Sequence, residues 1–285
     1  LEVPIYFSVI FSNLAVRLIL NIYCTIMRNI FAVFSSILLV AALSITAQAQ
    51  NYLTFTAVDG DAMFGLINQG SYDFPGIEYS FDKASWETLP ASVLRSIPDG
   101  QSVYLRGLNS AISADDEKNI TYFRMIGKIA ASGSVMSLLD GIGESKDIGA
   151  DYCFAGLFAN CASLTSAPEL PATKLSNYCY EAMFQGCSNL EHAPALPASQ
   201  LAENCYYTMF ISCTSLANAP GLPATQLAPG CYAGMFSGCS GLTKAPSLPA
   251  KQLADGCYYA MFQDCASLVD VPDTLPADYL ADSCY

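Results

Sequence analysis

The sequence predicts an α/β solenoid, a superhelical stack of coils with a short parallel sheet, preceded by a small antiparallel, sandwich-like β domain. A repeat of 26 residues runs through the second half of the chain, whereas residues 50–125 hold β-prone segments without that period. Hydrophobic residues make up 53% of the 285 residues, which argues against a disordered chain. The four predicted parts are residues 1–26, 27–49, 50–125 and 126–285.

The amino-terminal segment has the order of a secretory signal peptide. Met27, the first methionine, is followed by Arg28, an apolar run over residues 30–45 and the small-residue stretch that ends at Ala49. This run is short for a bilayer span, although a retained anchor stays an alternative. We predict a signal peptide over residues 27–49, cleavage near Ala49, a mature chain without a transmembrane span, and a secreted or outer-surface location. Residues 1–26 are predicted to be a spurious or untranslated extension.

The next segment, residues 50–125, predicts a compact antiparallel β domain. Its β-prone or alternating stretches are separated by Asp-Gly, Pro-Gly and Asn-Ser breaks, which indicate turns. These stretches lie at residues 52–56, 77–81, 102–106 and 120–124. We expect the single tryptophan, Trp86, to pack against this domain or at its rim. Residues 126–150 are expected to begin the solenoid and to cover the end of its core.

A strict repeat governs residues 126–285. Two columns of cysteine recur every 26 residues, eight residues apart. The first column holds Cys153, Cys179, Cys205, Cys231 and Cys257, and the second holds Cys161, Cys187, Cys213, Cys239 and Cys265. Phenylalanine, leucine and proline recur with the same period, starting at Phe158, Leu164 and Pro168. The repeating unit reads C-Y-x-x-M-F-x-x-C-x-x-L-x-x-A-P-x-L-P-A-x-x-L.

This period predicts a leucine-rich-repeat solenoid, because each coil must present the same apolar side chains to the coils on either side. The L-x-x-A-P segments are expected to form a short parallel sheet. The C-Y-x-x-M-F-x-x-C segments have a helical or turn-like spacing, and each L-P-A places a proline where the chain turns.

The repeat is similar to that of the BspA-like leucine-rich-repeat surface proteins of bacteria. Met183-Phe184-x-x-Cys187-x-x-Leu190 and its four counterparts match that family's core motif, and the resemblance covers about residues 126–285. The chain departs from the family pattern in its first cysteine column and in its Ala-Pro pair. The resemblance implies an exported, non-enzymatic protein that is associated with adhesion to host matrix or to other cells.

The cysteines have three interpretations. They are small buried hydrophobic residues in two structural columns, or they form disulfides, or they bind a metal. A helix over residues 179–187 would place its two cysteines about 12 Å apart, too far for a bridge. C-x7-C without histidine also lacks the close ligand pairs of zinc sites. Cys284 starts a further unit that stops at Tyr285, so we expect the sequence to be truncated.

Charge and composition narrow the function classes. The formal net charge is −13, which makes nucleic acid an unlikely partner because no basic stripe can follow a phosphate backbone. The only histidine, His192, occupies a variable position of the repeat. We therefore expect no enzyme, with no catalytic, cofactor-binding or metal-binding residues. A tyrosine column that begins at Tyr180 is either a stacking platform for sugars or a set of rings packed inside the wall.

A constant core with a changing surface favours a recognition protein over an enzyme. We expect the ligand to be a protein, or a component of a host or bacterial surface. The predicted ligand face consists of Ser166, Glu191, His192, Asn218, Lys244 and Asp270. The alternative is a glycan-binding module or an accessory part of a carbohydrate-active protein.

Overall fold

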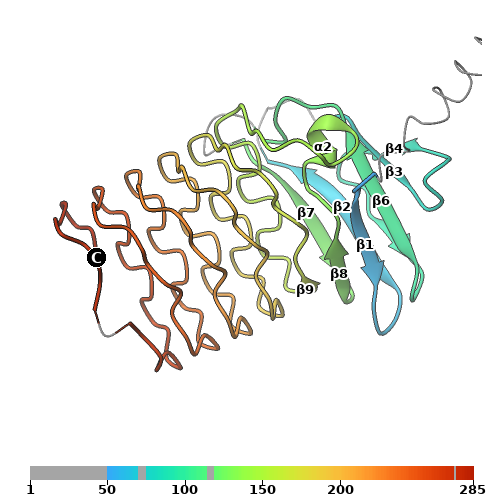
Figure 1. The fold of residues 1–285 in the computed structure, drawn as a ribbon. Coiled ribbons are helices and arrows are strands. Elements are labelled where there is room, and N and C mark those ends of the chain that lie inside the picture. Colours follow the sequence, from blue (N-terminus) through green and yellow to red (C-terminus); the bar gives the residue numbers. More distant parts are fainter. Residues whose placement is uncertain (1–49, 70–74, 114–118, 273) are drawn as a thin grey trace, which may run out of the picture. The chain divides into compact units, whose positions relative to one another are not determined.

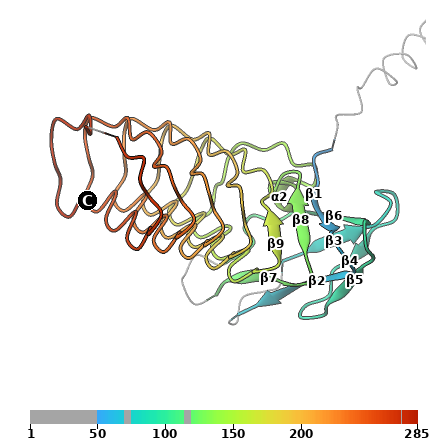
Figure 2. The same ribbon diagram turned by 90° about the horizontal axis from the view of Figure 1, so that it is seen from below.

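The computed structural model describes residues 50–69, 75–113, 119–272 and 274–285. The predicted extension over residues 1–26 and the predicted signal peptide over residues 27–49 lie outside the described residues. Residues 51–285 belong to one compact unit, in which two sheets lie beside a stack of coils (Figure 1). The chain repeats nearly the same path from coil to coil (Figure 2).

The two sheets contain all nine strands of the described residues. The larger sheet has the order β4 (Glu87–Thr88), β3 (Ile77–Ser80), β6 (Ser102–Gly107), β1 (Leu53–Ala57), β8 (Ile129–Ser132) and β9 (Leu164–Ser166). The smaller sheet has the order β5 (Arg95–Ile97), β2 (Ala62–Asn68) and β7 (Thr121–Ile126). All neighbouring strands are antiparallel except β8 and β9, which are parallel.

A shared aromatic core lies between the sheets. Strand β1 alternates buried and half-buried residues, as a strand with one covered face requires. The Phe55 ring from β1 meets Phe64 of β2 at 5.7 Å and Phe123 of β7 at 5.0 Å, both edge to face. Edge-to-face packing is favourable because a ring edge is positive and a ring face is negative.

One short helix, α2 (Ser137–Asp140), joins the sheets to the coils. The buried Ser137 hydroxyl donates to the Leu105 carbonyl and accepts from the Leu53 amide, at 2.9 Å each. The Asp140 carboxylate accepts four backbone N–H groups from residues 142–145, which fixes the loop after the helix. Partial burial opposes ionisation of Asp140, but these four donors hold its pKa below the ordinary value.

The hydrophobic core runs without interruption from the sheets into the coils. Residues 126–132, which the sequence assigns to the coils, include the end of β7 and all of β8. Strand β8 pairs with β1 on one side and with β9 of the first coil on the other. Phe158 of that coil stacks on Phe123 at 5.4 Å. The predicted boundary at residue 125 therefore crosses a continuous sheet and a continuous core.

The C-Y-x-x-M-F-x-x-C segments form what we call the turn wall, made of residues 152–161, 178–187, 204–213, 230–239 and 256–265. Of the helical and turn-like alternatives, the structure shows consecutive turns. A left-handed residue recurs every four positions, as at Tyr178 (φ 55°), Ala182 (φ 49°) and Gly186 (φ 71°). The repeated reversal prevents a helix, because a right-handed helix needs negative φ at every residue.

Backbone hydrogen bonds in the turn wall alternate between two partners. Phe184 donates its N–H to the Met209 carbonyl of the next coil at 2.9 Å, and Cys187 donates to Phe184 within its own coil at 3.1 Å. The same alternation occurs in the preceding and following coils. The turn wall therefore links each coil to the next through a row of backbone bonds.

The rest of each coil is more loosely linked. The expected parallel sheet is present as β9 and then only as isolated parallel bridges, one column of which joins His192, Asn218, Lys244 and Asp270. A second column joins Gln200, Gln226, Gln252 and Tyr279. Two prolines per coil, such as Pro220 and Pro223, contribute no N–H donors, so long ladders cannot form there.

Candidate functional site

The predicted ligand face lies along the first bridge column. Glu191, His192, Asn218, Lys244 and Asp270 are exposed, and we call these five residues the variable face. Ser166 differs from them because it is half-buried in β9 and donates its hydroxyl to the Ala131 carbonyl at 2.9 Å. The structure therefore brings five of the six predicted residues together on the surface.

Charge on the variable face is mixed. Lys244 pairs with Asp270 of the next coil at 3.0 Å, with both side chains mostly exposed. An exposed ion pair of this kind contributes little to stability, so its geometry can change when a partner binds. Glu191 and His192 add a carboxylate and an imidazole one coil away from Asn218. The surface is suited to polar, directional contacts along the stack.

The two cysteine columns lie inside the turn wall as free thiols. In the second column each thiol donates to a phenylalanine carbonyl of the preceding layer, as from Cys213 to Phe184, 29 residues earlier, at 3.0 Å. Cys187, Cys239 and Cys265 make the same bond across 29 residues at 3.0 to 3.1 Å, and Cys161 donates to Phe123 of β7, 38 residues earlier, at 3.0 Å. Among the described residues, Cys153, Cys179, Cys205 and Cys231 of the first column make no such bond. The two columns therefore have different polar environments.

Burial disfavours the thiolate form of these cysteines. It raises the thiol pKa from an ordinary 9.0 to about 12 at Cys153, Cys161, Cys205 and Cys239. The thiolate is the nucleophile and the metal ligand, and it is scarce at such values. No group of three or more potential metal ligands occurs in the part of the chain that the structure describes.

The tyrosine column is interior. Tyr180, Tyr206, Tyr232 and Tyr258 stack nearly parallel with ring centroids 5.8 to 5.9 Å apart, and each is at most 4% exposed. Their faces are covered by one another, so no ring face is open to a sugar. This finding removes the stacking platform that the sequence left open. Burial also raises the pKa of Tyr180, whose hydroxyl has no hydrogen-bond partner among the described residues.

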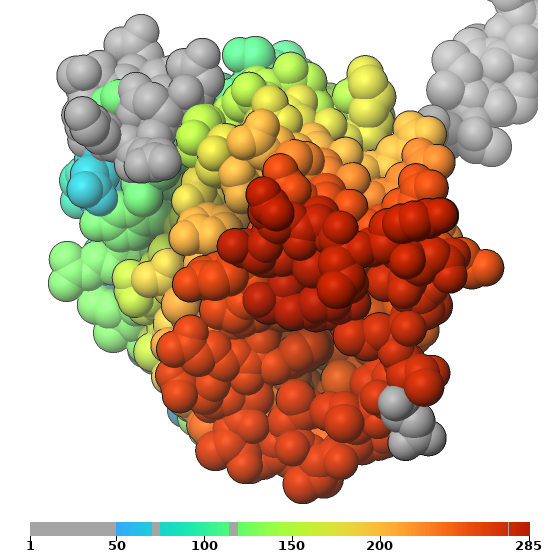
Figure 3. Space-filling model, turned by 90° about the vertical axis from the view of Figure 1, so that its left-hand side faces the viewer, coloured from blue at the N-terminus to red at the C-terminus, as the bar shows by residue number. Residues whose placement is uncertain are grey.

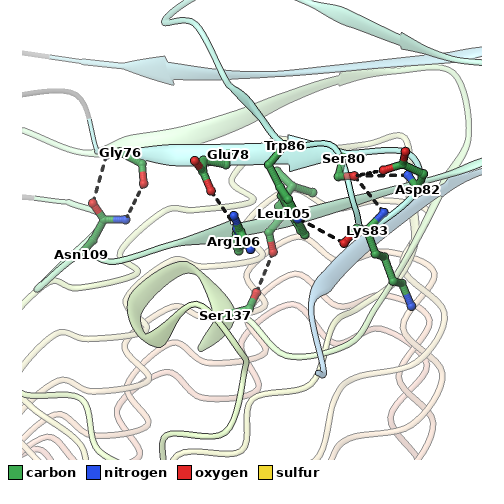
Figure 4. Close-up of polar contacts among 10 residues, drawn as sticks. All are labelled: Gly76, Glu78, Ser80, Asp82, Lys83, Trp86, Leu105, Arg106, Asn109 and Ser137. Carbon is green, nitrogen blue, oxygen red and sulfur yellow. Dashed lines mark hydrogen bonds and ion pairs between the residues drawn. The ribbon is translucent and has the colours of Figure 1, made fainter. Parts of the chain in front are cut away.

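A second candidate site lies on the larger sheet (Figure 4). The Arg106 guanidinium lies 3.9 Å from the centre of the Trp86 ring and donates to Glu78 at 2.7 Å. The Trp86 ring meets Tyr52 at 4.9 Å, edge to face, and its N–H donates to the Lys83 carbonyl. Trp86 therefore packs against the β domain, which is one of the two placements expected from the sequence; the other was a place at its rim.

A hollow of about 590 Å³ adjoins this cluster, lined by Glu78, Thr88, Arg106, Leu108 and Ile142 among others. It combines an ion pair with two exposed apolar side chains. Sequence reasoning missed this site. The sequence feature that could have revealed it is the opposite charge of Glu78 and Arg106 on two β-prone segments. The two residues face each other only when the register of β3 and β6 is known.

The described residues contain no helix with the length and hydrophobicity of a membrane span. Comparisons with protein-family models, with curated proteins and with solved structures find no match.

Proposed function

We propose that this chain is an exported surface protein that recognises a protein ligand through the variable face of a leucine-rich-repeat solenoid. The observation that carries the proposal is that buried positions of the repeat keep the same residue types from coil to coil, whereas an exposed position does not. Buried columns keep Cys, Phe and Leu in coil after coil, whereas the exposed bridge column changes from His192 to Asn218, Lys244 and Asp270. A constant core holds different polar groups at equal spacing, which suits contact with an extended partner surface.

Secretion and cell-surface location are part of this proposal. They rest on the signal-like order of residues 27–49 and on the resemblance of the repeat to BspA-like surface proteins. The ligand is a protein component of a host matrix or of another cell surface. The mixed charge of the variable face supports a protein partner, because complementary polar groups set specificity in such contacts.

The test replaces all five residues of the variable face by alanine and measures binding to a panel of immobilised matrix proteins by surface plasmon resonance. A matched control replaces the second bridge column, Gln200, Gln226 and Gln252, by alanine in the same coils. These glutamines are also exposed. We expect the face variant to lose at least about tenfold in affinity and the control to stay within about twofold.

Both variants should unfold at the wild-type urea concentration, because none of the eight side chains is buried. Equal binding by the face variant and the wild type would remove the variable face as the site. A glycan array supplies the opposing outcome. Clear carbohydrate binding, with no binding to any panel protein, would favour the alternative of a glycan-binding module.

A further inference from the structure

The hollow beside Arg106 on the larger sheet has no part in the proposed recognition of a protein by the variable face. Residues of β3 and β6 line it, together with the loop after α2. Its volume of about 590 Å³ lies within the range of about 300 to 1,000 Å³ that small-molecule sites occupy. The hollow is therefore large enough for a small organic ligand.

The Arg106 guanidinium is fixed by two neighbours. Its Nε donates to one carboxylate oxygen of Glu78 at 2.7 Å, and its central carbon lies 3.9 Å from the centre of the Trp86 ring (Figure 4). Its two terminal nitrogens have no acceptor among the described residues. A side chain that is already fixed loses little entropy when it binds, so these nitrogens are preorganised donors for a ligand in the hollow.

Hydrogen-bond acceptors lie next to these donors. One oxygen of Glu78 receives Arg106, and the other oxygen has no donor among the described residues. Thr88 of β4 is opposite Glu78 in the sheet, and its hydroxyl both donates and accepts. A ligand satisfies this set of groups when it brings adjacent groups that donate and accept, as neighbouring hydroxyls do.

Apolar side chains complete the lining. Leu108 is 83% exposed and Ile142 is 38% exposed, and both line the hollow. Large aliphatic side chains at the surface gain free energy when C–H groups cover them. A sugar ring matches this combination, because its hydroxyls lie at the edge and its C–H groups form a face.

Charge in the hollow disfavours an anion. Glu78 and Asp140 contribute two carboxylates, against the single cation of Arg106. The formal net charge of the whole chain is also negative, at −13. A carboxylate or phosphate ligand would therefore meet more negative than positive charge, whereas a neutral ligand would meet no net repulsion.

The sheet also disfavours a peptide in this hollow. Strand β3 pairs with β4 and β6, and strand β6 pairs with β3 and β1. Because both strands have neighbours on each side, no further strand can be added between them, and a peptide would lack the backbone bonds that such binding uses. Recognition in the hollow therefore depends on side chains.

We propose that this hollow is a binding site for a neutral saccharide. The terminal nitrogens of Arg106 donate to one ring hydroxyl, and the unpaired oxygen of Glu78 accepts from the neighbouring hydroxyl. Leu108 and Ile142 cover the C–H face of the ring. The site lies on the larger sheet and the variable face lies on the coils, so the two binding activities are separate.

The test titrates the full chain with four neutral trisaccharides (cellotriose, mannotriose, xylotriose and chitotriose) and with anionic trigalacturonate in a calorimeter. Trp86 is the only tryptophan of the chain, so a change in its fluorescence reports binding beside Arg106. We expect at least one neutral trisaccharide to bind with a Kd below about 1 mM and to change this fluorescence. Trigalacturonate should bind at least about tenfold more weakly.

Two pairs of variants locate the binding in the hollow. Arg106→Gln removes the terminal donors, and its control, Lys83→Gln, removes a cation that lies 4.2 Å from the centre of the Tyr104 ring and does not line the hollow. Calorimetry should show at least about tenfold weaker binding for Arg106→Gln and a change within about twofold for Lys83→Gln.

The second pair leaves the contact between Arg106 and Trp86 in place. Leu108→Glu replaces an apolar lining residue, and Val269→Glu makes the same change at a position that is also 83% exposed. Val269 belongs to the last coils, which form the near surface in Figure 3, at the other end of the stack from the sheets. Leu108→Glu should weaken binding at least about tenfold, and Val269→Glu should leave it within about twofold.

Three results would overturn the proposal. One is the absence of binding by all four neutral trisaccharides at concentrations up to about 10 mM. Another is binding of trigalacturonate as tight as that of the neutral sugars. The third is equal weakening by the two members of either pair. The alanine variant of the variable face should keep its saccharide binding, so failure of this proposal is distinguishable from failure of the proposed function.

Discussion

Serine substitutions in one coil test whether the two cysteine columns differ as the hydrogen bonds indicate. Cys205 and Cys213 are both fully buried in the same coil, so packing loss and any partial unfolding of the stack affect them alike. The Cys213 thiol donates to the Phe184 carbonyl at 3.0 Å, whereas the Cys205 thiol has no acceptor among the described residues. A serine hydroxyl at position 213 inherits that acceptor, and one at position 205 does not.

The expected loss of unfolding free energy follows from the cost of burying a hydroxyl without a hydrogen-bond partner, about 1 to 3 kcal/mol. Alanine at each position supplies the reference, because it removes the sulfur without adding a polar atom. The Phe184 carbonyl also accepts the Cys187 amide at 3.1 Å, so Cys213→Ala does not leave it unpaired. We expect Cys205→Ser to be less stable than Cys205→Ala by about 1 to 2 kcal/mol. At position 213, serine should be as stable as alanine or more stable.

The assay is equilibrium urea unfolding at pH 7 under reducing conditions, followed by far-ultraviolet circular dichroism. Trp86 fluorescence would report on the sheets and not on this coil. The comparison is the serine-minus-alanine difference at each position, which cancels the packing term. If serine were worse than alanine by the same amount at both positions, the thiol-to-carbonyl bonds would contribute nothing and the account of the second column would be wrong.

Three other outcomes are expected. Leu216→Ala should lower the free energy of unfolding by roughly 2 to 5 kcal/mol because it leaves a cavity in the core. Asn218→Ala should lower it by under about 0.5 kcal/mol. Equal losses for the two variants in urea titrations would contradict the assignment of inner and outer columns. Ala182→Gly should raise the free energy of unfolding by about 0.5 to 1 kcal/mol, because residue 182 has a φ of 49° and glycine relieves that strain. A loss of stability in the same titration would show that this φ is not left-handed. Stability should also fall as pH rises from about 9 toward 12, because unfolding frees thiols whose folded pKa is raised from 9.0 to about 12. Each of these four thiols loses about 1.4 kcal/mol of stabilisation by pH 10, so an unfolding free energy that is constant from pH 8 to 10.5 would contradict their burial.

The sequence period identified which residues share a column, because stacked coils place equivalent side chains above one another. For the segments of the turn wall it left a helical and a turn-like conformation open. The left-handed positions are held by tyrosine, alanine, asparagine, aspartate, threonine, serine and glycine in different coils, as at Ala182 and Thr208, so no single residue type marks them. Alternate residues of the turn wall bond to the neighbouring coil in this conformation, and the sequence of a single repeat cannot reveal bonds between coils.

The candidate sites were also predictable only in part. The sequence predicts the variable face, because exposed positions change from coil to coil while buried positions do not. Ser166 was misplaced, since β9 draws the first coil into the larger sheet and ties the Ser166 hydroxyl to Ala131. The Glu78, Arg106 and Trp86 cluster depends on the pairing of β3 with β6, which a sequence without pairing information does not supply.

The turn wall joins the coils and leaves the rest of each coil open for contact. Hydrogen–deuterium exchange measured by mass spectrometry tests it directly within one central coil. Every amide from residues 204–213 makes a backbone hydrogen bond, whereas few do in residues 217–228, where two are prolines. We predict that peptides from residues 204–213 exchange far more slowly than peptides from residues 217–228. Equal rates for the two peptides, or faster exchange in the turn wall, would contradict the account.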